Sequence, residues 1–140
     1  MKHRELSYPV LIWGRDYAFL ADSIAKLERT PRSQFERLRK QAKRGHVFLL
    51  DSEGRMFKVT DRIVISSVKP IIRLFANFRT APILSEGENL NIDQFKRQIE
   101  SAIGARQKGD YDCDFLSQLA EALPSAATYR DALNCVPKGM

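Results

Sequence analysis

The chain has 140 residues, of which 44% are apolar and 29% charged, and its formal net charge is +6. This length and composition are typical of one folded domain with its own core. The longest apolar runs, residues 47–50 and 70–72, are far too short to span a bilayer, which excludes a membrane-spanning protein. The N-terminal residues lack the apolar region of a signal peptide, so we expect a cytoplasmic protein.

In the first third of the chain, residues 8–13 predict a short buried strand that ends at Gly14. From Asp16, apolar residues recur at steps of three and four, which predicts a helix over residues 17–27. Thr30-Pro31 should end this helix, because proline removes a backbone donor. Ser33 and Glu36 then form a capping box for a second helix, which should run to about Arg44 and end at Gly45.

The middle of the chain predicts strands. Residues 46–50 and 55–59 flank a polar turn and predict a hairpin at about 46–60, with another strand at 62–66. Residues 70–78 fit either a helix or a strand, and their apolar spacing favours a helix. A further strand is expected at residues 82–84.

The last third predicts helices. Asn91 and Gln94 form a second capping box, before a helix that should end at Gly104. Two more helices are expected near residues 114–123 and up to about Asn134. The predicted fold class is therefore α+β, a single domain over residues 1–140 with about five helices and a small, mostly antiparallel sheet. Cys113 and Cys135 leave two alternatives, a disulfide or free thiols, and a reducing compartment favours thiols.

The net charge of the chain lies in one segment, residues 29–44. This segment has seven Lys or Arg and one acid, Glu36, whereas basic and acidic residues cancel in the rest of the chain. On the predicted second helix, Phe35, Leu38 and Ala42 share the side that should face the core. The opposite side carries Arg37, Lys40 and Arg44, and the apolar edge is flanked by Arg39 and Lys43. A concentrated excess of this kind favours an anionic partner, although a solvated helix face is the simpler alternative.

The predicted order from about Asp16 to Thr60 is helix, break, basic helix and hairpin. With Phe35, Leu38, Ala42, Gly45 and Val47, this stretch resembles the winged-helix family. The resemblance implies that the basic helix enters the major groove and that the hairpin lies along the phosphates. It would place Arg37, Lys40 and Arg44 against DNA and Arg55 against the backbone. The stretch departs from the family at Arg29-Thr30-Pro31, where a small turn residue is usual.

Other sites are poorly supported. Asp110, Asp112, Asp114 and Glu121 have the spacing of an EF-hand loop, but Phe115 stands where that loop needs glycine. The acids fit helix capping better, and no metal site is predicted. The chain lacks the common nucleotide-binding and hydrolase motifs. His46 could serve as a general base or simply end a strand, so no catalytic residue and no cofactor are predicted.

These observations predict a non-catalytic protein that binds nucleic acid through the basic helix and the adjacent hairpin. The expected contact residues are Arg32, Arg37, Lys40, Lys43, Arg44 and Arg55. The alternative is a small immunity protein that neutralises a cognate toxin by binding an acidic protein surface. The sequence does not decide between these partners, and it leaves the oligomeric state open.

Overall fold

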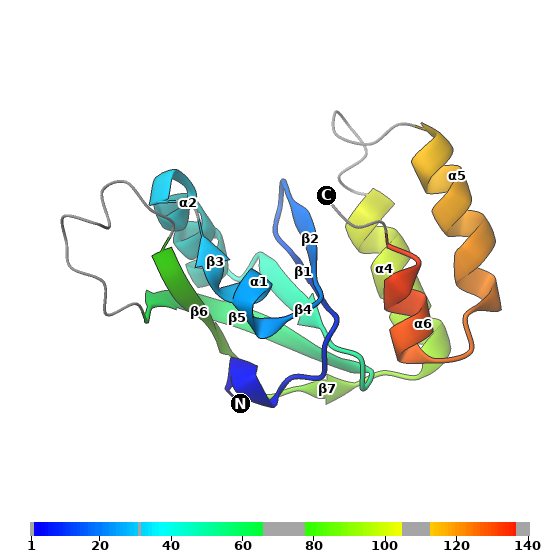
Figure 1. Ribbon diagram of the computed structural model, residues 1–140, viewed down its shortest axis with the longest axis horizontal. Helices are drawn as coiled ribbons and strands as arrows, with labels where there is room; N and C mark the ends of the chain where they lie inside the picture. Colours follow the sequence, from blue (N-terminus) through cyan, green and yellow to red (C-terminus); the bar gives the residue numbers. More distant parts are fainter. Residues whose placement is uncertain (1, 31, 66–77, 105–112, 137–140) are drawn as a thin grey trace.

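The computed structural model describes residues 2–30, 32–65, 78–104 and 113–136 (Figure 1). Its helices are α1 (Ile24–Glu28), α2 (Arg32–Lys43), α4 (Ile92–Gly104), α5 (Cys113–Ala122) and α6 (Tyr129–Asn134), with short 3-10 helices η1 (His3–Glu5) and η2 (Leu123–Ser125). Its strands are β1 (Val10–Trp13), β2 (Ala18–Ala21), β3 (Arg29–Thr30), β4 (Val47–Leu50), β5 (Arg55–Val64), β6 (Phe78–Leu84) and β7 (Glu88–Asn89). None of these described helices is long and apolar enough to cross a membrane.

The strands form one antiparallel sheet in the order β2-β1-β4-β5-β6-β3, and β7 pairs with the start of β5. The mixed α+β class is therefore confirmed. The sheet is larger than predicted, because β1 and β2 form a hairpin of their own and β5 continues through ten residues to Val64.

Helices cover the sheet on both faces (Figure 1). Side chains of β1 alternate between two apolar clusters, because successive residues of a strand point to opposite faces. Leu11 and Trp13 pack toward α4 and α6, whereas Val10 and Ile12 pack on the side of α1 and α2. All four side chains are buried. The apolar run in the sequence thus marks a strand that is covered on both sides.

The helix predicted over residues 17–27 is wrong. Residues Ala18–Ala21 pair with β1 in register, from Trp13 opposite Ala18 to Val10 opposite Ala21. Only Ile24–Glu28 is helical, and its N-cap is Ser23, whose Oγ accepts from the amide of Lys26. The apolar spacing of this segment is compatible with a helix and with a strand. Pairing with the buried neighbouring strand β1 favoured the strand.

The basic helix and the hairpin after it are confirmed as α2, β4 and β5. Gly45 ends α2 in the left-handed region, at φ +77°. The helix begins at Arg32, so Ser33 lies inside its first turn and is not the predicted N-cap. The helix predicted at residues 70–78 falls on residues 66–77, which lie outside the described part, except that Phe78 begins β6.

The C-terminal helices were predicted closely. Asn91 Oδ1 accepts from the amide of Gln94 at 2.8 Å, and Gln94 Oε1 accepts from the amide of Asn91 at 3.2 Å, so the capping box is present. Cys135 has a free thiol, which donates to the carbonyl of Asp131.

The turn between β4 and β5 contacts the C-terminal helices at Gly54. This residue has φ +81°, and a Cβ there would lie 2.5 Å from Cζ of the Tyr129 ring in α6. Its carbonyl accepts from Leu90, and the Tyr129 hydroxyl donates to the carbonyl of Leu90. The turn, the start of α4 and α6 therefore meet at one point.

We expect Gly54→Ala to lower the free energy of unfolding by about 2–4 kcal/mol, because the left-handed backbone and the Tyr129 ring both oppose a side chain. Gly104→Ala is the matched control, since a Cβ there has no neighbour within 4 Å. Urea unfolding of both variants measures the difference. Equal stability of the two variants would contradict the close contact.

Candidate anion-binding surface

The apolar side of α2 packs on the sheet beside β5, as its sequence predicts. Phe35 and Ala42 are buried and Leu38 is half-buried. The exposed side of the helix is polar or charged throughout: Ser33, Gln34, Glu36, Arg37, Lys40, Lys43 and Arg44. The side chain of Arg32 lies outside what the structure describes.

Two arginines of α2 are used to attach the helix to the sheet. Arg37 forms an ion pair with Asp16 in the turn between β1 and β2, and Asp16 also accepts from Gln41 at 2.8 Å. These contacts lower the pKa of Asp16, the Gln41 hydrogen bond contributing most. Arg39 Nε donates to Asp61 of β5 at 3.2 Å. The predicted outward role of Arg37 is therefore combined with a structural one.

The cations at the C-terminal end of α2 form no such ion pair, although the positive charge of Lys43 helps to lower the pKa of Asp61. Lys40, Lys43 and Arg44 are exposed, and none forms an ion pair with a carboxylate of the described residues. Glu36 also forms no ion pair within that part of the chain. The three cations lie within five consecutive residues at the C-terminal end of α2.

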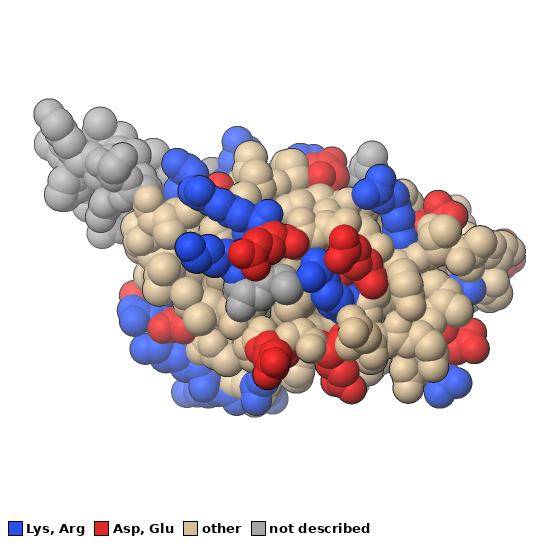
Figure 2. All heavy atoms as spheres, turned by 90° about the horizontal axis from the view of Figure 1, so that it is seen from below, with Lys and Arg blue, Asp and Glu red and all other residues tan. Residues whose placement is uncertain are grey.

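Lys58 of β5 joins these three side chains. A Cβ on Gly45 would lie 2.9 Å from the Lys58 ammonium, which places that ammonium over the C-terminal end of α2. Lys58 is exposed and points away from the core residues Phe57 and Val59 on either side of it. We call Lys40, Lys43, Arg44 and Lys58 the basic patch. Figure 2 shows the molecule from below, the side away from α2 in Figure 1, and on this face Lys and Arg side chains lie among Asp and Glu side chains.

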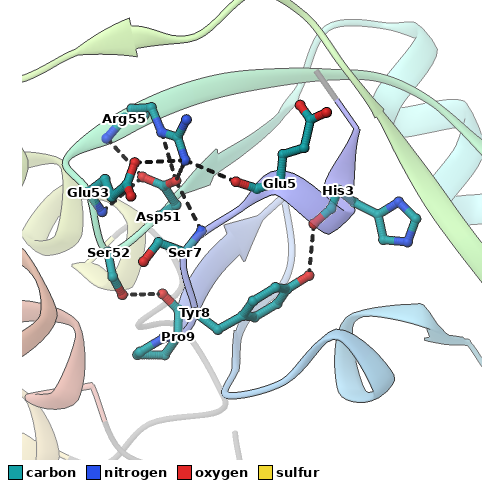
Figure 3. Close-up of polar contacts among 9 residues, drawn as sticks. All are labelled: His3, Glu5, Ser7, Tyr8, Pro9, Asp51, Ser52, Glu53 and Arg55. Carbon is teal, nitrogen blue, oxygen red and sulfur yellow. Dashed lines mark hydrogen bonds and ion pairs between the residues drawn. The ribbon is translucent and has the colours of Figure 1, made fainter.

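Arg55 does not belong to this surface. It follows the β4–β5 turn, and its guanidinium holds Asp51, whose side chain is fully buried (Figure 3). Arg55 Nε donates to Asp51 Oδ2 at 2.9 Å, and Nη2 contacts Asp51, Glu53 and the carbonyl of Glu5. Hydrogen bonding to Asp51 raises the pKa of Arg55. This predicted phosphate contact is instead a structural ion pair.

Asp51 also organises the backbone around it. Its carboxylate accepts from the amides of Ser7, Glu53 and Arg55. Ser52 adds a hydrogen bond from its hydroxyl to the carbonyl of Pro9, at 2.7 Å. The turn therefore holds the N-terminal segment against the sheet (Figure 3).

The winged-helix arrangement is not formed. Its first helix is replaced by β2 and the short α1, and the strands expected to form a wing are interior strands of the sheet. The tip of that hairpin lies beside β7, at the opposite end from α2 in Figure 1. A single surface that combines the basic helix with the hairpin tip is therefore excluded by the topology.

A second polar cluster, which the sequence analysis missed, surrounds Glu28. The Glu28 carboxylate is buried, accepts from Arg79 at 3.2 Å and contacts His3 Nε2 at 3.2 Å. Burial alone would raise the pKa of Glu28, but hydrogen bonds from His3 and Arg79 outweigh it and lower the pKa. The nearby Tyr8 hydroxyl donates to the carbonyl of His3, and burial, with Glu28 beside it, raises the pKa of Tyr8 to about 12. No sequence spacing links these residues, since His3, Glu28 and Arg79 come from η1, α1 and β6, and Tyr8 lies between η1 and β1.

Arg62 is a third feature that the sequence did not indicate. The register between β5 and β6 shifts between Val59 and Asp61. A bulge of this kind reverses the alternation of a strand, so Arg62 is turned into the interior and is only 6% exposed. Its Nη1 donates to Thr80 Oγ1 at 2.8 Å and to Thr30 Oγ1 at 3.1 Å.

The other candidate sites gain no support. Asp110 and Asp112 lie outside the described residues, as does the side chain of Asp114. Within the described part of the chain, no cluster of His, Cys, Asp and Glu could hold a metal ion. His46 Nδ1 is buried without a hydrogen-bond partner in the structure.

We expect Asp51→Asn to lower the free energy of unfolding by about 3 kcal/mol, because it leaves the largely buried Arg55 without its main counter-charge. Glu53→Gln is the matched control. Glu53 pairs with the same guanidinium but has a 63% exposed side chain, so its loss should cost less than about 1 kcal/mol. Urea unfolding at neutral pH gives both values, and a larger loss for Glu53→Gln would contradict the assignment.

The lowered pKa of Glu28 predicts a pH dependence of stability. Its carboxylate binds a proton more weakly in the folded state than in the unfolded state, so its contribution is complete above the unfolded pKa of about 4.3. That contribution is lost as the pH falls through the folded-state pKa. Glu28→Gln should therefore flatten the acid limb of a plot of urea midpoint against pH. The exposed Glu100→Gln should leave that limb unchanged, and a parallel shift of both curves would refute the role of Glu28.

Comparison with protein-family models, with curated proteins and with solved structures gave no match, so only the geometry described above bears on function.

Proposed function

We propose that the protein is a non-catalytic nucleic-acid-binding protein and that the basic patch on α2 and β5 is its contact surface. The observation that carries this proposal is that Lys40, Lys43 and Arg44 are exposed at the C-terminal end of α2 and form no ion pair with a carboxylate of the described residues, Lys43 having only a longer-range interaction with Asp61. Cations in this state attract a condensed negative charge such as a phosphate backbone.

The chemistry of the surface favours a polyanion over an acidic protein. Protein interfaces of good affinity have a buried centre of apolar or aromatic side chains. The exposed side of α2 offers none, because Phe35 and Ala42 are buried beneath it. A charged surface without an apolar centre is the usual composition of a site that contacts phosphates.

The attachment of α2 also supports the proposal. Arg37 with Asp16 and Arg39 with Asp61 hold the helix to two different parts of the sheet. The helix axis is therefore fixed, and only the ends of the Lys40, Lys43 and Arg44 side chains have to be ordered when a ligand binds. A small ordering cost leaves more of the electrostatic free energy for affinity.

Fluorescence anisotropy with labelled double-stranded DNA and single-stranded RNA tests the proposal. If about three or four phosphates are contacted, log Kd should change with log salt with a slope of about 3 to 4 in magnitude. The double variant Lys40→Glu/Arg44→Glu should weaken binding at least about tenfold at low salt, since two of the contacts become repulsive.

The matched control is Arg97→Glu/Arg130→Glu, which makes the same change in net charge on exposed residues of α4 and α6. It should retain nearly wild-type affinity. Equal losses in both double variants would mean that only net charge matters. Absence of binding to either nucleic acid at low salt, or a tight 1:1 complex with an acidic toxin instead, would overturn the proposal.

A further inference from the structure

Arg62 is a buried cation whose charge is not matched. It is 6% exposed, and its hydrogen-bond partners are the hydroxyls of Thr30 and Thr80, which also bond each other at 2.7 Å. The two threonine hydroxyls accept hydrogen bonds from Arg62, but they carry no negative charge that could balance its positive charge. Burial lowers the pKa of Arg62, and the interaction with the nearby Tyr17 only partly offsets this effect.

The acids on neighbouring elements are occupied by other cations. Asp61 pairs with Arg39, and Glu28 pairs with Arg79 and His3. No carboxylate of the described residues forms an ion pair with Arg62. The chain segment 66–77 contains no Asp or Glu in its sequence, so it cannot supply the missing charge. Buried arginines are normally paired, because an isolated charge in a protein interior is costly.

The geometry leaves one side of the guanidinium free. Both printed hydrogen bonds of the guanidinium come from Nη1, to Thr30 and Thr80. The remaining edge, formed by Nε and Nη2, is the edge that binds two oxygens of one anion side by side. Neither Nε nor Nη2 has a hydrogen-bond partner among the described residues, whose bonds to Arg62 both go to Nη1.

The start of α2 adds a second positive element. Thr30, which bonds Arg62, lies two residues before the first residue of this twelve-residue helix. The amides of a helix N-terminus favour negative charge. A cation and a helix N-terminus that are brought together by the fold would both be stabilised by one anion between them.

We propose that Arg62, oriented by Thr30 and Thr80, is the anchor of a binding site for a small tetrahedral oxyanion, inorganic phosphate or the phosphate of a small monoester. A tetrahedral anion can give two oxygens to the Nε–Nη2 edge and still offer others to the helix amides. The ligand is small because Arg62 is too deeply buried for the backbone of a nucleic acid to reach it. This site is therefore separate from the basic patch.

Two measurements on the full chain test the site, thermal unfolding and the phosphorus NMR line width. Both use millimolar inorganic phosphate or O-phosphoserine in chloride buffer of constant ionic strength, where general salt effects are small. Wild-type protein should show a saturable rise in Tm and saturable line broadening. Broadening with phosphate alone would indicate a free ion as ligand, and broadening with both would extend the site to monoesters.

Three variants locate the effect. Arg62→Lys keeps the charge but loses the paired donors, so its affinity should fall at least about tenfold. Arg62→Met should not respond to phosphate, and it should have a higher Tm than the wild type in chloride alone, because the unmatched charge is gone. Arg97→Met on α4 is the control and should respond as the wild type does.

Absence of saturable binding by the wild-type chain would overturn the proposal, whatever the variants do. An unchanged response in Arg62→Lys would also overturn it, because the anion would then bind elsewhere. The outcome is independent of the proposed function. The double variant of the basic patch should retain the phosphate response, and Arg62→Met should retain nucleic-acid binding.

Discussion

The structure depends on the requirement that β1 and β4 be covered on both faces. Their side chains alternate between the two apolar clusters, with Val47 and Leu49 on one side and Leu50 on the other. One helical layer cannot cover both faces, so α4 and α6 cover one and α1 and α2 cover the other (Figure 1).

This requirement explains the position of the basic helix. Its apolar residues are needed in the core, and a helix so oriented must present its cations to solvent. The basic patch is thus partly a consequence of packing. Its ability to bind an anion depends on which cations of α2 are not used in ion pairs with the sheet.

The acids of this half of the molecule are used internally. Asp16 and Asp61 hold α2, Glu28 holds η1 and β6, and Asp51 holds the hairpin turn and the N-terminal segment. Each of these four acids is paired with at least one cation, so among the described residues they leave several positive charges without an ion pair. Some of them are exposed on α2 and one is buried at Arg62. The net charge of +6 is therefore expressed locally, on one side of the sheet, and does not form a uniform background.

Features encoded by neighbouring residues were predictable from the sequence. The capping box at Asn91, the glycine that ends α2 and the hairpin turn depend on contacts within a few residues, and all three are present. Features decided by distant residues were not predictable. The segment at 18–21 carries helical spacing but pairs with β1, and nothing within the segment reveals that partner. The same distinction applies to the candidate site. The exposure of Lys40 and Arg44 could be predicted from helix geometry. The pairing of Arg55 with Asp51, which removes Arg55 from the site, and the position of Lys58 beside α2 depend on the fold.

The burial of Arg62 shows how one local irregularity can change the chemistry of a strand. With regular alternation after Phe57 and Val59, the interior positions of β5 would be residues 61 and 63, and Arg62 would face outward like Lys58. The register shift between Val59 and Asp61 exchanges the two faces, leaving Ile63 42% exposed and Arg62 buried. A bulge that only fitted the strand to its neighbours would be expected to keep the apolar side chain inside, since that arrangement buries more apolar area. Here the exchange exposes an isoleucine and buries a charge, and it brings that charge to two threonines that fix its orientation. An arrangement that costs stability in this way is typical of sites where a ligand completes the interactions.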